Sequence, residues 1–201
     1  MYLFSNYVYI YNMNKVGDLM SKKEATINSK CFFEGKILRL RVDEVQLEGG
    51  KLGKREIVEH PGAVAIVAIT HDKMVLLVTQ FRKPMEKDLI EIPAGKLEKN
   101  ETPLGCAKRE LLEETGYVAN NWRELFAIYT SPGFSNEKVI IYLATEVVKT
   151  LDNPMDSEEI ASIDLISVSE ALKLIESKKI VDGKTVAGIL AARIFYENET
   201  T

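Results

Sequence analysis

The sequence predicts an α+β domain with largely mixed sheets, and two observations carry that prediction. β-branched runs separated by turn residues fill the first half of the chain, and one helical segment lies among further strands before two helices close the chain. Of the 201 residues, 46% are apolar. That content suffices for one well-packed domain and excludes a disordered or fibrous protein.

Strands are expected where short apolar runs lie between turn-forming residues. The first runs cover 37–42, 55–58, 63–69 and 74–79, and the turn clusters Glu48-Gly49-Gly50, His60-Pro61-Gly62 and Thr70-His71-Asp72-Lys73 separate them. A short strand at 89–92 is ended by Pro93. Two further strands, 124–129 and 139–145, are predicted on either side of a loop at 131–137.

Three helices are predicted from local start and stop signals. The first covers 103–115, because Thr102 can cap it, Pro103 suits the first helical position and Gly116 can end it. Ser167 and Glu170 have the spacing of a capping box, which predicts that a second helix begins there. A third helix is expected at about 185–196.

The N-terminal segment differs in character from the rest of the chain. Residues 1–25 are aromatic and carry no charge before Lys15, so they lack the positive region and the cleavage site of a signal peptide. Met13 and Met20 are both available as later starts. We favour an over-long gene start as the explanation; an additional strand or an arm that clasps a partner is the alternative.

Charge and cysteine content exclude several classes of function. The net charge is −4, without the basic surplus typical of a nucleic-acid-binding protein. Cys31 and Cys106 lie far apart and the chain has 2 histidines, which excludes a disulfide framework, a thiolate zinc site and a histidine-rich metal centre. No run approaches the roughly 20 apolar residues that cross a bilayer. We therefore expect a cytoplasmic protein that binds neither nucleic acid nor membrane and whose metal ligands are oxygens.

The first predicted helix carries the strongest chemical pattern. Glu110, Glu113 and Glu114 stand at i, i+3 and i+4, so their carboxylates share one helix face and repel each other unless a cation neutralises them. Oxygen ligands of this kind suit Mg²⁺ or Mn²⁺. Arg109 lies four residues before Glu113 and can orient its carboxylate in a bidentate pair. Gly95 would let the preceding loop approach the ion. Taken alone, the three glutamates are more typical of a solvated acidic face.

The complete spacing resembles the signature of the Nudix hydrolases, Gly-x5-Glu-x7-Arg-Glu-U-x-Glu-Glu-x-Gly-U, where U is apolar or aromatic. Its fixed positions are filled by Gly95, Glu101, Arg109, Glu110, Glu113, Glu114, Gly116 and the flanking Leu111 and Tyr117. The resemblance implies an α/β/α sandwich that hydrolyses a nucleoside diphosphate linked to a further moiety, with Mg²⁺ as cofactor and Mn²⁺ as a possible substitute.

That resemblance also assigns residues to the metal. Glu110 and Glu114 correspond to the main ligands, and Ala94 offers a backbone carbonyl. Glu113 corresponds to an additional ligand or an outer group, and we count it, with Arg109 that orients it, among the catalytic residues.

Three further segments resemble the ADP-ribose pyrophosphatase branch of these enzymes. They are 55–69, the pair 80–82 and 91–95, and 131–137, and the resemblance spans roughly Lys30 to Phe195. It implies cleavage of ADP-ribose to AMP and ribose 5-phosphate by a homodimer. Residues 26–58 would form an N-terminal β arm that reaches the partner, and 59–201 the Nudix domain. A broader nucleoside-diphosphate-sugar hydrolase, or a module that senses ADP-ribose without cleaving it, are the alternatives.

Candidate substrate contacts follow from the charge of ADP-ribose. Its pyrophosphate is anionic, so Arg82 is a candidate ligand for it; a surface position on a strand is the alternative. Pro132, Gly133 and Phe134 in the loop at 131–137 could border the ribose or the base, or could form an ordinary turn.

The branch also implies a late loop glutamate that positions or deprotonates the attacking water. The acidic loop at 153–159 fits, with Glu159 as the better match and Glu158 as the second; an ordinary solvated loop is the alternative.

Two other patterns are interpreted as structural. Gly183-Lys184-Thr185 resembles a P-loop ending, but Lys178 occupies the position where that motif needs glycine. Cys106 has no neighbouring histidine in the sequence to activate it as a nucleophile.

Overall fold

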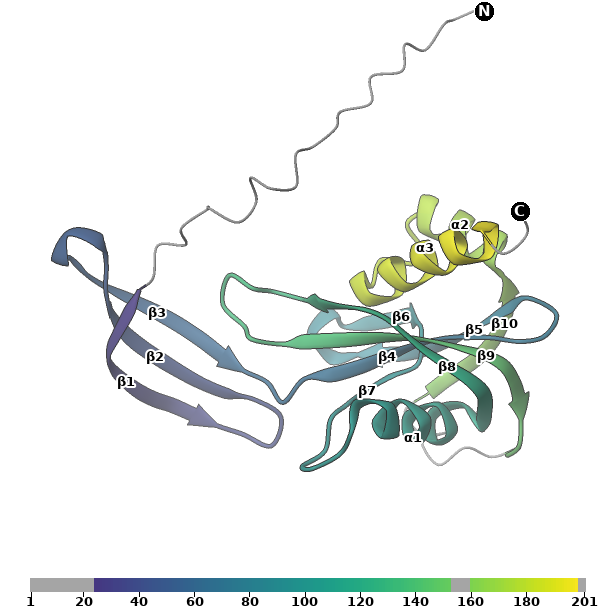
Figure 1. The fold of residues 1–201 in the computed structure, drawn as a ribbon, viewed down its shortest axis with the longest axis horizontal. Helices are drawn as coiled ribbons and strands as arrows, with labels where there is room; N and C mark the ends of the chain where they lie inside the picture. Colours follow the sequence, from purple (N-terminus) through teal and green to yellow (C-terminus); the bar gives the residue numbers. More distant parts are fainter. Residues whose placement is uncertain (1–23, 153–159, 199–201) are drawn as a thin grey trace, which may run out of the picture.

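The computed structural model describes residues 24–152 and 160–198, which form two sheets and three helices (Figure 1). The smaller sheet contains three antiparallel strands in the order β1-β2-β3: β1 (Ala25–Glu34), β2 (Arg39–Gln46) and β3 (Leu52–Glu59). It lies to one side of the larger sheet, so the N-terminal region forms a β arm as the sequence predicts.

The larger sheet has seven strands and is mixed. Its order is β10-β5-β4-β9-β8, with β6 paired to β5 and β7 to β4. Only the β4–β9 pair is parallel among the described pairings of this sheet. The strands are β4 (Ala63–Ile69), β5 (Met74–Arg82), β6 (Lys87–Glu91), β7 (Ala94–Lys96), β8 (Tyr117–Tyr129), β9 (Lys138–Lys149) and β10 (Ile160–Ser167).

Helices cover both faces of this sheet. Helix α1 (Pro103–Thr115) lies on one face, and α2 (Val168–Glu176) and α3 (Gly183–Asn198) lie on the other (Figure 1). This arrangement confirms the α/β/α sandwich. No helix in the described part of the chain is long and apolar enough to cross a bilayer.

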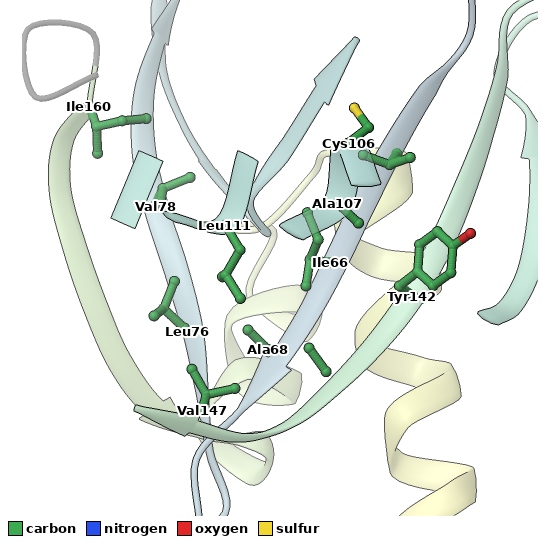
Figure 2. Close-up of a cluster of buried hydrophobic side chains, with 12 residues drawn as sticks. Ile66, Ala68, Leu76, Val78, Cys106, Ala107, Leu111, Tyr142, Val147 and Ile160 are labelled. Atoms are coloured by element: carbon green, nitrogen blue, oxygen red, sulfur yellow. The ribbon is translucent and has the colours of Figure 1, made fainter. Parts of the chain in front are cut away.

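Strand β4 is the centre of the core because helices bury it from both sides. Residues 64–69 have no exposed surface. Alternate side chains, including Ile66, pack with Leu111 of α1, as Figure 2 shows. The side chains between them, Ala65, Val67 and Ile69, pack with Ile189 of α3. A strand covered on both faces needs apolar residues at every position, which explains the continuous apolar run.

Element bounds follow the sequence prediction where the signals are local. The bounds of α1 and β4 match, and Ser167 caps α2 through a hydrogen bond from Glu170 N to Ser167 Oγ of 3.1 Å. Strand β8 begins at Tyr117 rather than at residue 124, because pairing with β9 carries it through a polar stretch that resembles a turn. Strands β1, β7 and β10 were not predicted individually. Neither β1 nor β7 has a periodic apolar pattern.

Candidate active site

Helix α1 is fixed at both ends and along its apolar face. Thr102 Oγ1 accepts from Gly105 N at 3.1 Å, and Gly116 ends the helix in the left-handed region at φ 74°. A Cβ at Gly116 would lie 2.3 Å from the carbonyl oxygen of Leu151, so only glycine fits this turn. Leu111 is fully buried on the inner side. The glutamate positions of α1 are therefore held rigidly beside the sheet.

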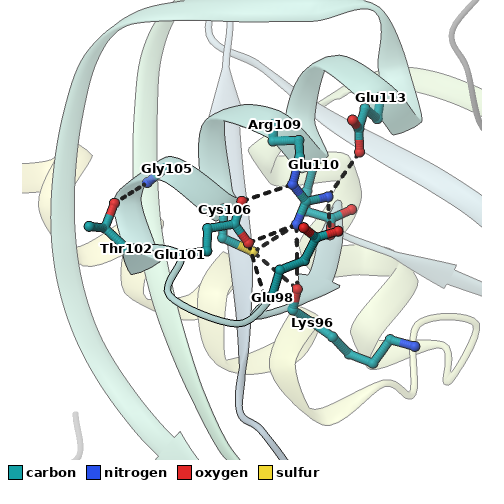
Figure 3. Close-up of polar contacts among 9 residues, drawn as sticks. All are labelled: Lys96, Glu98, Glu101, Thr102, Gly105, Cys106, Arg109, Glu110 and Glu113. Carbon is teal, nitrogen blue, oxygen red and sulfur yellow. Dashed lines mark hydrogen bonds and ion pairs between the residues drawn. The ribbon is translucent and has the colours of Figure 1, made fainter. Parts of the chain in front are cut away.

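Arg109 is the hub of the polar contacts at this helix (Figure 3). Its Nε and Nη2 donate to the two carboxylate oxygens of Glu101 at 2.8 and 3.0 Å. Its Nη1 donates to Glu110 at 2.8 Å and to Glu113 at 2.9 Å. The expectation of a bidentate pair with Glu113 is therefore wrong. The loop before α1 folds back and places Glu101 across the guanidinium, so Glu113 receives one hydrogen bond.

This network changes the ionisation of its members. Hydrogen bonding from Arg109 lowers the pKa of Glu101 to about 2, and the carboxylates around Arg109, Glu101 first, raise the pKa of its guanidinium. Burial raises the pKa of Cys106 to about 12, so its thiol stays protonated and is no nucleophile at neutral pH. The structural interpretation of Cys106 agrees with this environment.

Two glutamates of α1 contact the strand segment that precedes the helix. Glu114 Oε2 accepts from the backbone N–H of Ala94 at 3.0 Å. A Cβ at Gly95 would lie 1.9 Å from the Glu110 carboxyl carbon, so the carboxyl group occupies the space that any other residue would fill. Glu110 and Glu114 are also 9% and 7% exposed. The structure thus brings Ala94, Gly95 and the two predicted main ligands together.

The side chains on this face fit a hard divalent cation in their chemistry. Glu110, Glu113 and Glu114 supply oxygen donors, and no soft ligand from cysteine or histidine is required. Within the described ranges, no three acidic, cysteine or histidine side chains already converge as a metal cage. Instead, the guanidinium of Arg109 compensates Glu110 and Glu113 in the structure.

A second charged cluster surrounds Glu91, which ends β6 and lies three residues before Ala94. Arg82 forms a bidentate pair with Glu91, with both hydrogen bonds at 2.8 Å, and Lys184 also pairs with Glu91 Oε2. Lys184 lies 3.0 Å from Asp182, and Thr185 Oγ1 donates to Asp182 at 2.6 Å. Arg82, predicted as a substrate ligand, therefore has an internal partner, while its side chain remains 37% exposed.

The predicted substrate loop at 131–137 is attached to the junction of the arm and the larger sheet. Val58 N donates to the Phe134 carbonyl at 2.8 Å, and His60 N donates to Asn136 Oδ1 at 2.8 Å. Phe134 is 57% exposed, and a Cβ at Gly133 would meet no atom within 4 Å. The loop, with Pro132 at its start, is therefore anchored by these two hydrogen bonds, while Gly133 and Phe134 are open to solvent.

The remaining predicted residues, Glu158 and Glu159, lie outside the described residues. Sequence reasoning missed Glu91 and Lys184 as members of one cluster. In the sequence, Glu91 appeared only within the segment 91–95 that resembles the ADP-ribose pyrophosphatases. The sequence around Gly183 gave no indication that Lys184 pairs with a residue of β6.

Comparison with known proteins agrees with this geometry. Residues 59–187 match the NUDIX domain model. The chain is 46% identical over 172 residues to the ADP-ribose pyrophosphatase of Bacillus subtilis (strain 168), covering 85% of this chain and 93% of that protein. It is also 46% identical to the methanol dehydrogenase activator of Bacillus methanolicus, covering 83% and 91%. A crystal structure of an ADP compounds hydrolase has a similar fold, with a TM-score of 0.76 at 20% identity, covering 89% of this chain and 96% of that one.

Proposed function

This chain belongs to the Nudix family, and we propose that it hydrolyses the pyrophosphate bond of ADP-ribose to AMP and ribose 5-phosphate, with Mg²⁺ as cofactor. The observation that carries the proposal is the contact of Glu110 and Glu114 with Gly95 and Ala94, which sets carboxylates of one helix against a close-lying backbone. The 46% identity to an ADP-ribose pyrophosphatase over most of the chain supports the choice of substrate.

Each residue has a role in this proposal. Glu110, Glu114 and the Ala94 carbonyl would hold the cation, with Glu113 as a further or outer ligand. A bound divalent cation would supply neutralisation of the charge that develops on the pyrophosphate oxygens. Arg109 restrains the carboxylates of Glu110 and Glu113 through its two Nη1 hydrogen bonds.

The reaction itself is a displacement at phosphorus. The oxygen of a water molecule bonds to one phosphorus, the bond from that phosphorus to the bridging oxygen breaks, and two phosphate monoesters leave. Glu159, or Glu158 beside it, would position this water and accept its proton. Arg82 would bind the pyrophosphate, and Pro132, Gly133 and Phe134 would border the ribose or the base.

We further propose that the protein is a cytoplasmic homodimer that binds neither nucleic acid nor membrane. Residues 26–58 would be the dimerisation arm and 59–201 the catalytic domain. The arm exposes apolar side chains that a second copy could cover: Ile27, Phe32 and Phe33 are 57%, 60% and 56% exposed. Cys31 and Cys106 are free thiols, as suits a reducing compartment.

A hydrolysis screen tests the proposed reaction. The substrates are ADP-ribose, ADP-glucose, GDP-mannose, dinucleoside polyphosphates and oxidised dGTP, each with Mg²⁺. We expect ADP-ribose to have the highest kcat/KM. Preference for several nucleoside diphosphate sugars would favour the broader hydrolase, and preference for a deoxynucleoside triphosphate would overturn the substrate. Binding of ADP-ribose that is released intact would favour a sensor.

The equal identity to a methanol dehydrogenase activator favours a second candidate function, activation of such a dehydrogenase. To test this function, the rate of a purified methanol dehydrogenase is measured with and without this protein. An increase in the dehydrogenase rate would support this function, and an unchanged rate would dismiss it.

A further inference from the structure

Glu91 is a buried carboxylate that is compensated by two cations. It ends β6, three residues before Ala94, and is 1% exposed. Arg82 donates to both of its oxygens, and Lys184 pairs with Oε2, one of the same two oxygens. Glu91 is thus paired with two cationic side chains, and one of them, that of Lys184, comes from the start of α3.

The two cations differ in their exposure to solvent. The Arg82 side chain is 37% exposed, whereas that of Lys184 is 14% exposed. Lys184 also pairs with Asp182 at 3.0 Å, and Asp182 accepts from the Thr185 backbone N–H at 3.0 Å. Thr185 Oγ1 in turn accepts from the buried N–H of Ile92 at 2.9 Å. Lys184 therefore lies between two carboxylates in a largely buried position, while the Arg82 side chain is partly exposed.

Burial makes the second cation necessary if Arg82 is to move. Burial alone would raise the pKa of Glu91, but Arg82 and Lys184 together hold that pKa below its ordinary value. Removing the sole partner of a buried carboxylate is strongly destabilising. If Arg82 were the only counter-ion of Glu91, it would therefore stay paired with it. With Lys184 in place, the carboxylate keeps a counter-ion when the guanidinium turns away.

We infer that Lys184 is the resident counter-ion of Glu91 and frees Arg82 to bind the substrate pyrophosphate. Lys184 is thus a positioning residue that acts through Arg82. The inference rests on the proposed role of Arg82 in ADP-ribose hydrolysis. It also gives a function to a segment whose sequence pattern indicated only a structural one.

The test compares a variant of Lys184 with a double variant of Glu91 and Lys184, and it measures KM and kcat for ADP-ribose separately. Lys184→Met keeps the apolar stem and removes the charge, so we expect KM to rise roughly tenfold, the effect of weakening one charge-assisted hydrogen bond. The turnover number should change little. Lys179→Met, in an exposed position before α3, is the matched control and should leave KM unchanged.

The double variant Glu91→Gln/Lys184→Met separates this role from a structural one. The neutral amide introduced by Glu91→Gln no longer holds Arg82 by charge, so KM should return toward the wild-type value. Because this variant has no buried, uncompensated charge at these two positions, it should fold even if Lys184→Met alone does not. An unchanged KM in Lys184→Met would overturn the inference. A double variant that has wild-type thermal stability but does not restore KM would overturn it as well.

Arg82→Gln distinguishes the two layers of the proposal. A rise in KM for Arg82→Gln without one for Lys184→Met would contradict the counter-ion role alone. An unchanged KM for Arg82→Gln would remove the pyrophosphate role of Arg82 and the inference with it, while hydrolysis of ADP-ribose by the same preparation would leave the proposed reaction standing.

Discussion

Two charged clusters contact the segment from Glu91 to Gly95, and they differ in their balance of carboxylates and cations. In the first, one guanidinium, that of Arg109, pairs with three carboxylates, those of Glu101, Glu110 and Glu113. In the second, Arg82 and Lys184 meet the two carboxylates of Glu91 and Asp182. We call them the acid-rich cluster and the balanced cluster.

The difference indicates what each cluster can receive. The acid-rich cluster gathers negative charge on a rigid helix, so added positive charge stabilises it, and a divalent cation suits its oxygen donors. The balanced cluster already compensates its buried carboxylate and holds one cation at the surface, so it can offer that cation to an anion. A metal ion at the acid-rich cluster and the guanidinium of Arg82 would then bind the same pyrophosphate.

We expect the strongest effect from removing the charge of Glu114, the predicted metal ligand on α1 that contacts Ala94 beside the acid-rich cluster. Glu114→Gln keeps the size of the side chain and the helix propensity but removes one charged oxygen donor. We expect kcat to fall by roughly 10³-fold while the fold persists, measured at saturating Mg²⁺ alongside circular dichroism. Glu176→Gln, on the exposed side of α2, is the control. Activity within a few-fold of wild type would remove Glu114 from the ligands.

A second large effect is expected at Glu159, the proposed water-positioning residue outside both clusters. If Glu159 positions the water, Glu159→Gln should lower kcat by about 10²-fold or more, with little change in ADP-ribose or Mg²⁺ binding. Glu158→Gln shares its loop and charge and is the internal control. Sensitivity at Glu158 instead would shift the assignment by one residue, and insensitivity at both would show that another group handles the water.

A smaller effect tests the contact between the acid-rich cluster and the strand segment. In Gly95→Ala the new methyl group would overlap the Glu110 carboxyl group, so that carboxylate must move. We expect the Mg²⁺ concentration for half-maximal activity to rise by about 10-fold to 100-fold, as for other losses of ligand positioning. Gly183→Ala adds the same methyl group where no atom lies within 4 Å, and it should leave the Mg²⁺ dependence unchanged.

The smallest effect concerns the pH dependence of the acid-rich cluster. The pKa of Glu101 is lowered from 4.5 to about 2 in the folded protein, so its pair with Arg109 stabilises the fold above pH 4.5. That contribution is lost as the pH falls from 4.5 toward 2. Glu101→Gln should lower Tm by roughly 2–4 °C at pH 7, and the difference from wild type should shrink below pH 4.5. A difference that is constant with pH would contradict this ionisation.

The sequence predicted the elements whose signals are local and missed the contacts that join distant segments. Thr102, Pro103 and Gly116 lie at the ends of α1, so its bounds could be derived without tertiary information. The i, i+4 spacing favoured Glu113 as the main partner of Arg109, but chain reversal before the helix gives Glu101 the bidentate position. The pair of Glu91 with Lys184 joins residues 93 positions apart, which no periodicity can indicate.

A ³¹P NMR time course over a Mg²⁺ titration shows whether the protein uses a divalent cation to cleave ADP-ribose. We predict that the pyrophosphate resonances of ADP-ribose are replaced by the two monoester resonances of AMP and ribose 5-phosphate, at a rate that rises with Mg²⁺ and vanishes in EDTA. Intact ADP-ribose at saturating Mg²⁺, or an equal rate in EDTA, would rule out this metal-dependent hydrolysis.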